Sequence, residues 1–169
     1  LLGRMQKKKD EIAEIVVEAA PGGQALRNAE PETVLAAKFS MPHAIAATVQ
    51  LGTAGARAFT KDTLDDPEIS KLRTRVRLQP YANIKPAPND RPARVTMRFN
   101  DGGEMSAVVE SARGGADKPF DEPTLLSKLA ENAGALFPAA PETLKKVIAG
   151  DRDLLSQSWR DALARMVGA

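Results

Sequence analysis

The strongest constraint on the fold lies near the middle of the chain, where two alternating runs flank a turn at residues 100–103 (Asn-Asp-Gly-Gly). Apolar and polar residues alternate over 93–99 and return over 104–110, which is the period of a strand with one buried face. Glycines beside Asn and Asp supply the positive φ angles that a tight turn needs. The pattern therefore predicts a β-hairpin, and a hairpin must bury one face against other elements.

Two further runs indicate strands. Residues 10–20 are rich in Ile and Val, with a spacing that fits a helix or a strand. Their β-branched content and the Pro-Gly-Gly stop at residues 21–23 favour a strand. From Val76 to Tyr81 apolar and polar side chains alternate, which is typical of a half-buried strand. A proline-rich stretch from Pro80 to Pro92 then predicts a loop.

An alanine-rich segment from Thr33 to Leu51 predicts a helix packed closely against its neighbours. Pro42 is tolerated in such a helix if it lies in the first turn, with Ser40 or Met41 near the cap. Gly52 follows the last apolar residue and ends the helix.

Further helix starts are marked by acidic caps and prolines. The run Asp-Asp-Pro-Glu at residues 65–68 combines a capping acid, a proline at the first position and an acid in the first turn, and its helix extends to about Arg73. Three helices are predicted at the carboxy terminus. They begin near Asp121, Pro141 and Asp151.

Taken in order, these elements predict an α+β fold: an antiparallel sheet with helices on one face, followed by carboxy-terminal helices. We place an α+β domain at residues 1–116 and a helical segment at 117–169. A chain of 169 residues with 43% hydrophobic side chains is long and apolar enough to bury a core. The sequence contains no cysteine, which excludes disulfides, thiolate metal sites and cysteine nucleophiles.

The charge balance gives no support for a nucleic-acid partner, because 24 basic and 22 acidic residues leave a formal net charge of only +2. The lysines at 7–9 form the only basic cluster, and we interpret them as a solvated terminus. Arg73, Arg75 and Arg77 alternate, and we expect them to form one solvated face of a strand. We also find no apolar run long enough to span a membrane and no signal peptide, and we expect a cytoplasmic protein.

Few residues offer catalytic chemistry. His43 is the only histidine, so neither a second histidine base nor a histidine-based metal site exists, and the carboxylates follow no metal-binding spacing. A lone histidine is often a packed or exposed side chain without a chemical role. Lys38 lies just before the alanine-rich helix, where an ammonium opposes the helix dipole. The alternative is a solvated lysine on a loop.

Residues 37–46 (Ala-Lys-Phe-Ser-Met-Pro-His-Ala-Ile-Ala) resemble the central signature of the MmgE/PrpD family, in which a basic residue and Phe-Ser precede an aromatic residue and an alanine-rich helix. Residues 91–102 and 112–120 are similar to later motifs of that family. The helix start at 65–67 stands in the expected order between them. The resemblance extends from about Asp10 to the carboxy terminus.

The resemblance implies a carboxy-terminal lid domain. Members of the family include 2-methylcitrate dehydratase, cis-aconitate decarboxylase and an iminodisuccinate epimerase, and they combine a large all-helical domain with a smaller α+β lid. The active site lies between the two domains. The family implies a homodimer, no metal and no organic cofactor, a small carboxylic-acid substrate, and terminal helices that pack on the helical domain. It also implies a lyase, typically a hydro-lyase of propionate metabolism.

The shared chemistry begins with proton removal next to a carboxylate-bearing carbon, followed by dehydration, decarboxylation or epimerisation. By resemblance, His43 is the candidate catalytic residue, at a position where many relatives carry tyrosine. Lys38 and Ser40 are the candidate substrate-binding residues. The family's other catalytic residues precede Leu1, which is not a methionine. We therefore expect a piece of a longer protein that has no turnover alone.

The main alternative is a non-catalytic binding or assembly module. In that case His43 is exposed, or buried away from any cleft, and its replacement leaves ligand binding unchanged. A third hypothesis, nucleic-acid binding through residues 7–9 and the three arginines, predicts an affinity for DNA that falls steeply with salt.

Overall fold

A computed structural model describes residues 9–167 of the chain. These residues belong to two compact units, which divide between Pro119 and Phe120. Lys7 and Lys8, two of the three clustered lysines, lie outside the described residues, as does Leu1.

The first unit is built on a four-stranded sheet with the strand order β2-β1-β3-β4. The strands are β1 (Ile12–Ala19), β2 (Val76–Pro80), β3 (Ala93–Phe99) and β4 (Glu104–Val109). Strands β3 and β4 form the predicted hairpin, and Gly102 in its turn has a φ of 81°. This angle is the left-handed conformation that glycine adopts without strain.

The direction of one strand pair differs from the prediction. Strand β1 is antiparallel to β3, as expected, but parallel to β2. After Ala19 the chain crosses a helical layer before it re-enters the sheet at Val76, and such a crossover brings the chain back to the end of the sheet from which β1 started. The α+β fold is therefore confirmed, with one parallel pair at the β2 edge.

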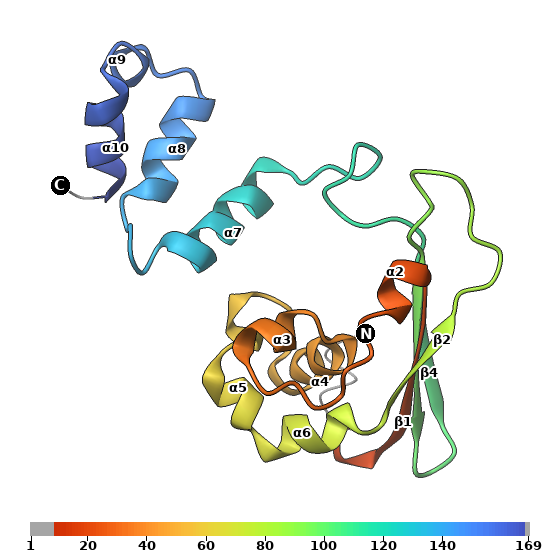
Figure 1. Cartoon of the computed structure of the whole chain (residues 1–169). Helices are drawn as coiled ribbons and strands as arrows, with labels where there is room; N and C mark the ends of the chain where they lie inside the picture. The colour runs from red at the N-terminus through yellow and green to blue at the C-terminus, as the bar shows by residue number, and fades with distance from the viewer. Residues whose placement is uncertain (1–8, 168–169) are drawn as a thin grey trace. The chain divides into compact units, whose positions relative to one another are not determined.

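Helices cover one face of this sheet (Figure 1). They are α2 (Pro21–Gln24), α3 (Val34–Lys38), α4 (Met41–Leu51), α5 (Lys61–Asp65) and α6 (Pro67–Arg73), with 3-10 turns at Lys9–Glu11 and Ala56–Ala58. Ile15 and Met97 from the sheet pack with Val49 of α4 and Ile69 of α6 in one buried cluster. Truncation of a side chain such as Ile15 to alanine costs about 2–5 kcal/mol in such a core.

The segment from Thr33 to Leu51 forms two helices, where the sequence predicted one. The break falls at Phe39–Ser40 because Pro42 has no N–H to donate to the carbonyl of Lys38. Ser40 caps the second helix, α4, by accepting the N–H of His43 at 3.0 Å, and Gly52 ends it with a φ of 72°. The predicted cap and stop of α4 are confirmed, whereas the short helix α3 before it was not predicted.

The uncovered face of the sheet carries paired charges within the first unit. Arg94 Nη1 binds Glu18 at 2.9 Å. Arg98 binds Glu14 at 2.7 Å and Glu104 at 3.3 Å. These cross-strand pairs neutralise one another, so this face offers no excess positive charge to a polyanion.

The three alternating arginines do not share a face, and that prediction is wrong. Arg73 ends α6 and is only 6% exposed. Arg75 precedes β2 and donates to the carbonyl of Ile12, while Arg77 alone is exposed. Arg73 belongs to the last turn of the helix and not to the strand, and its side chain is buried.

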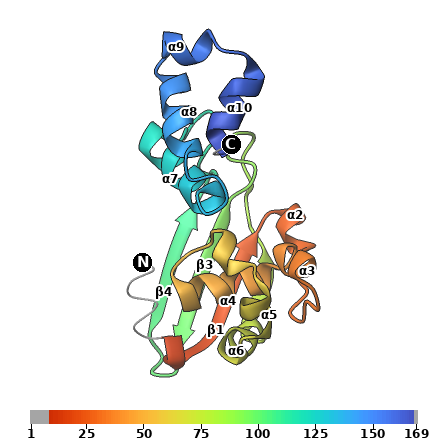
Figure 2. The same cartoon turned by 90° about the vertical axis from the view of Figure 1, so that its left-hand side faces the viewer.

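The described part of the second unit, residues 120–167, contains four helices. They are α7 (Glu122–Ala133), α8 (Ala140–Ile148), α9 (Arg152–Leu155) and α10 (Trp159–Val167). Asp121 and Asp151 cap α7 and α9 through N–H groups at 2.9 and 3.0 Å, as predicted. The predicted third helix divides because Ser158 accepts the N–H of Asp161 at 3.2 Å and starts a new helix. Helices α8 and α10 pack side by side (Figure 2).

Candidate functional site

The three candidate site residues meet at the corner between α3 and α4, which we call the α3–α4 corner (residues 38–43). Lys38 is the last residue of α3 and is exposed. Its ammonium makes no hydrogen bond or ion pair with the residues that the structure describes. The expectation that it opposes a helix dipole is wrong, because the charge lies at the negative, carboxyl end of α3.

Ser40 is buried, with 1% of its surface exposed. Its Oγ accepts the N–H of His43 and donates to the carbonyl of Asn28. The other N–H groups of this helix start are also occupied, since Met41 donates to Leu26 at 2.8 Å and Ala44 donates to Ser40 at 3.0 Å. A substrate contact from Ser40 therefore requires the exchange of one of these bonds, and the assignment stays a prediction.

His43 is completely buried within the described residues, and protein groups contact both ring nitrogens. Nε2 lies 2.9 Å from the carbonyl oxygen of Ala58, which only accepts, so Nε2 carries the proton. Nδ1 accepts from Nη1 of Arg73 at 3.5 Å. The ring also lies against Phe59, with centroids 5.9 Å apart.

Burial lowers the pKa of His43 from its ordinary value. The hydrogen bond to Ala58 acts in the opposite direction, and the charge of Arg73 lowers the pKa further. Because an imidazolium would place a proton on Nδ1 facing a guanidinium, the neutral ring is the stable form near neutral pH. Its catalytic role is a prediction that the geometry leaves untested.

Arg73 is the neighbour of His43 that the sequence did not reveal. Its Nη2 donates to the carbonyl of Leu64 at 3.2 Å, and its Nε has no hydrogen-bond partner among the described atoms. Burial lowers the pKa of this guanidinium, and Glu30 raises it. Thirty positions separate Arg73 from His43, and no local pattern links the two.

Hollows flank both ends of α4. A groove of about 540 Å³ begins at Met41 and runs along residues 19–23 and 90–93. Gly23 is required there, because a Cβ at this position would stand 2.9 Å from the Cβ of Ala19. A second hollow of about 340 Å³ lies beyond the other end of α4. Neither lining includes Lys38 or His43.

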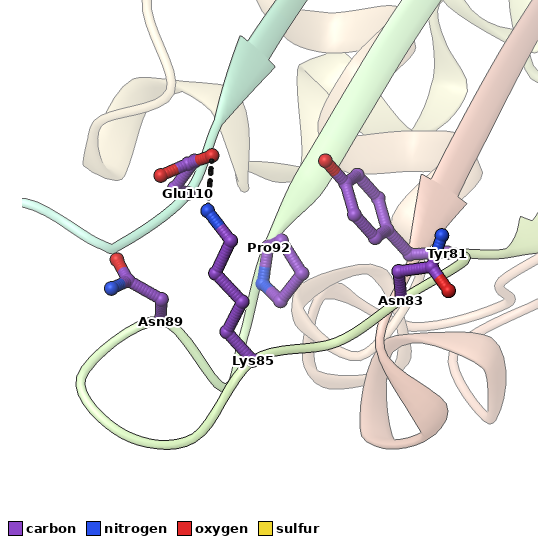
Figure 3. Close-up of a pocket in the computed structure, with 6 residues that line it drawn as sticks. All are labelled: Tyr81, Asn83, Lys85, Asn89, Pro92 and Glu110. Carbon is purple, nitrogen blue, oxygen red and sulfur yellow. Dashed lines mark hydrogen bonds and ion pairs between the residues drawn. The ribbon is translucent and has the colours of Figure 1, made fainter.

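A small pocket of about 30 Å³ lies under the loop that joins β2 to β3 (Figure 3). Lys85 closes one side through an ion pair to Glu110 at 3.1 Å. The ring of Tyr81 and Pro92 form the opposite walls, and Arg94 stacks on Tyr81 with its guanidinium carbon 5.4 Å from the ring centroid. The volume is that of about one or two waters, too small for an organic substrate.

Residues 9–167 contain no group of three or more His, Asp or Glu side chains arranged to hold a metal ion. In the same part of the chain, every helix is too short or too polar to cross a bilayer.

The fold and the corner together define a class of protein: an α+β domain, followed by a helical unit, with an exposed lysine and a buried histidine at a helix–helix corner. The profile of the MmgE/PrpD C-terminal domain matches residues 1–154, and the chain belongs to this family. The resemblance drawn from the motifs is thereby confirmed. A search of the curated proteins gave no match.

Proposed function

We propose that the chain is the lid of an MmgE/PrpD enzyme that acts on small di- or tricarboxylic acids. The reaction begins with proton abstraction next to a carboxylate and leads to dehydration, decarboxylation or epimerisation. The observation that carries the proposal is family membership over residues 1–154, together with an exposed Lys38 in the family signature that has no partner among residues 9–167.

Lys38 is suited to attract a substrate carboxylate. Its ammonium is exposed and has no partner among the described residues, so binding an anion breaks no existing ion pair. The 540 Å³ groove begins at Met41, three residues further along the chain, and has the size of a small-molecule site. A charge-assisted hydrogen bond is stronger than a neutral one, which favours a carboxylate over a neutral ligand here.

His43 is the proposed base. Burial favours its neutral form, which is the form that accepts a proton. Nδ1 is the nitrogen held less tightly. It lies 3.5 Å from Nη1 of Arg73, whereas Nε2 lies 2.9 Å from the carbonyl oxygen of Ala58. In this proposal, substrate binding displaces the contact with Arg73 and exposes Nδ1. An all-helical domain of the same protein supplies the remaining catalytic groups. The enzyme is a homodimer and uses no metal or cofactor.

The proposal is tested with the purified chain and with the chain fused to an all-helical MmgE/PrpD domain. The substrates are 2-methylcitrate, citrate and cis-aconitate. We expect no turnover from the chain alone and turnover from the fusion. Turnover by the chain alone contradicts the division of the site, and an inactive but folded fusion contradicts the enzymatic role.

Within an active fusion, Lys38→Ala should raise KM about tenfold, with a smaller effect on kcat, because it removes a charge-assisted contact to a carboxylate. Lys71→Ala is the matched control, since Lys71 is also exposed on a helix and makes only a 4.0 Å pair with Glu68. Equal KM values for the two variants would remove Lys38 from the site.

One observation favours the alternative, a non-catalytic binding or assembly module. His43 is completely buried, and both of its nitrogens contact protein groups. Under this alternative, His43→Asn leaves ligand binding by the folded fusion unchanged. Under the proposed enzymatic role, the same substitution abolishes turnover while the fold, followed by circular dichroism, persists.

A further inference from the structure

The hollow beyond the carboxyl end of α4 has a lining of its own, and we call it the α4–α5 hollow. It is lined by Leu51, Thr53, Arg57, Thr60, Asp62 and Thr63. Its volume of about 340 Å³ lies within the range of small-ligand sites. We propose that the α4–α5 hollow binds a small hydroxycarboxylate, with Arg57 holding the carboxylate and Asp62 accepting the hydroxyl.

Arg57 supplies the positive charge. It lies in the 3-10 turn Ala56–Ala58, is exposed, and makes no hydrogen bond or ion pair with the residues that the structure describes. All five of its N–H donors are thus available, and the planar guanidinium matches the two oxygens of a carboxylate.

Two threonine hydroxyls add further donors, of which that of Thr60 is held by one long hydrogen bond. Thr53 Oγ1 already accepts the N–H of Gly55 at 3.1 Å, but its own proton has no acceptor among the described atoms. Thr60 Oγ1 accepts the N–H of Thr63 at 3.3 Å, and its proton faces only the Oγ1 of Thr63 at 3.5 Å. A lining dominated by donors selects a ligand rich in acceptors, such as a carboxylate.

Asp62 is the acceptor in the lining. Its carboxylate is exposed and takes part in no hydrogen bond or ion pair within residues 9–167. A ligand that carries only carboxylates would be repelled there, whereas a ligand hydroxyl can donate to it. Leu51, 41% exposed, offers an apolar wall for the carbon skeleton. Carboxylate, hydroxyl and a short carbon chain together describe a hydroxy acid.

The floor of the hollow is held firmly, which limits the entropy lost on binding. Thr63 is 7% exposed, and the single proton of its Oγ1 is shared between the carbonyls of Ala58, at 3.1 Å, and Thr60, at 2.9 Å. The same Ala58 carbonyl accepts from His43 Nε2. The carboxyl end of the turn that carries Arg57 is therefore tied to two buried side chains, His43 and Thr63.

The binding site rests on its own lining and does not depend on the proposed enzymatic role. The test is a titration of the full chain with L-malate, succinate and inorganic phosphate at constant ionic strength, followed by amide chemical shifts. We expect saturable shifts at Thr53, Arg57 and Thr60 with malate. Succinate, which lacks the hydroxyl, and phosphate should bind more weakly.

Two arginine variants distinguish specific binding of malate in the α4–α5 hollow from nonspecific electrostatic attraction of an anion to the protein. Arg57→Gln should weaken malate binding by about tenfold or more, because it removes a charge-assisted pair. Arg77→Gln is the matched control, an exposed arginine on the uncovered face of the sheet. Asp62→Asn should reduce the preference for malate over succinate.

Three results would overturn the proposal. They are an absence of saturable shifts with malate, equal weakening by Arg57→Gln and Arg77→Gln, and succinate or phosphate binding as tightly as malate. These readouts need no turnover, so an inactive fusion protein leaves them unaffected. Conversely, loss of the α4–α5 site would leave the effect of Lys38 on KM standing.

Discussion

At the scale of single residues, His43 shows how a candidate catalyst depends on partners that the sequence does not reveal. Its ring lies between the carbonyl of Ala58 and the guanidinium of Arg73. Neither contact is implied by spacing, because 15 and 30 positions separate these partners from the histidine. The motif identified the residue, and only the packing of α4 against α6 and against the 3-10 turn Ala56–Ala58 explains its burial, tautomer and charge.

The pH dependence of stability should report the buried state of His43. The pKa of His43 is lowered in the folded state, so the unfolded chain binds more protons as the pH falls below about 6.5, and stability declines over that window. Above this pH, the stabilisation that comes from the buried neutral His43 is fully present. Urea unfolding at about pH 7.5 and about pH 5.5 should therefore show a lower free energy of unfolding at the acidic value.

The variant His43→Gln provides the comparison, because its amide retains a donor for Ala58 but does not titrate. Carboxylates titrate in both proteins, so the difference between them isolates the histidine. An identical loss of stability on acidification in both proteins would mean that His43 is accessible to protons in the folded state.

At the scale of elements, local signals determined what could be predicted. The hairpin was predictable because its turn residues and the alternation of apolar and polar residues in its strands agree. The caps Ser40, Asp121 and Asp151 were predictable because each supplies a side-chain oxygen just before the N–H groups of a helix start. The parallel pairing of β1 and β2 could not be predicted, because the direction of β2 depends on a crossover of more than fifty residues. The short helix α3, which ends at Lys38 before this cap, was not predicted either.

The α3–α4 corner should be sensitive to Ser40. Ser40→Ala removes the cap on His43 and the bond to Asn28, and should lower the free energy of unfolding by about 1–2 kcal/mol. Ser70→Ala on α6 is the control, an exposed serine expected to change stability by less than about 0.5 kcal/mol. Equal midpoints of urea unfolding for the two variants would show that the corner does not depend on this cap.

At the scale of the whole molecule, the two units have unequal cores. The core of the first unit combines large aliphatic side chains from the sheet and from α4 and α6, and Met105 of β4 packs against it. The buried apolar side chains of the second unit are Ala140, Leu154, Ala162 and Met166 among the described residues. A fifty-residue helical unit with so small a core is marginally stable by itself.

The second unit also exposes many large apolar side chains. They are Leu125, Leu136, Phe137, Ile148, Leu155, Trp159, Leu163 and Val167. Trp159, Leu163 and Val167 follow one another at intervals of four on α10, so they share one face of that helix. A second apolar face, with Ala162 and Met166, is already buried within the unit. Exposed apolar faces of this kind are typical of interaction surfaces.

These differences predict that the two units unfold separately. Trp159 is the only tryptophan of the chain, and it lies in the second unit, so its fluorescence reports that unit alone, whereas far-ultraviolet circular dichroism reports both units. We expect the fluorescence midpoint in urea to fall below the main dichroism midpoint, because the smaller core exposes less apolar surface on unfolding and contributes less free energy. A chain ending at Pro119 should retain the main dichroism transition, because the core cluster lies entirely before that residue. Coincident midpoints in the full chain, together with loss of the transition in the shortened one, would instead show that the two units fold as one cooperative body.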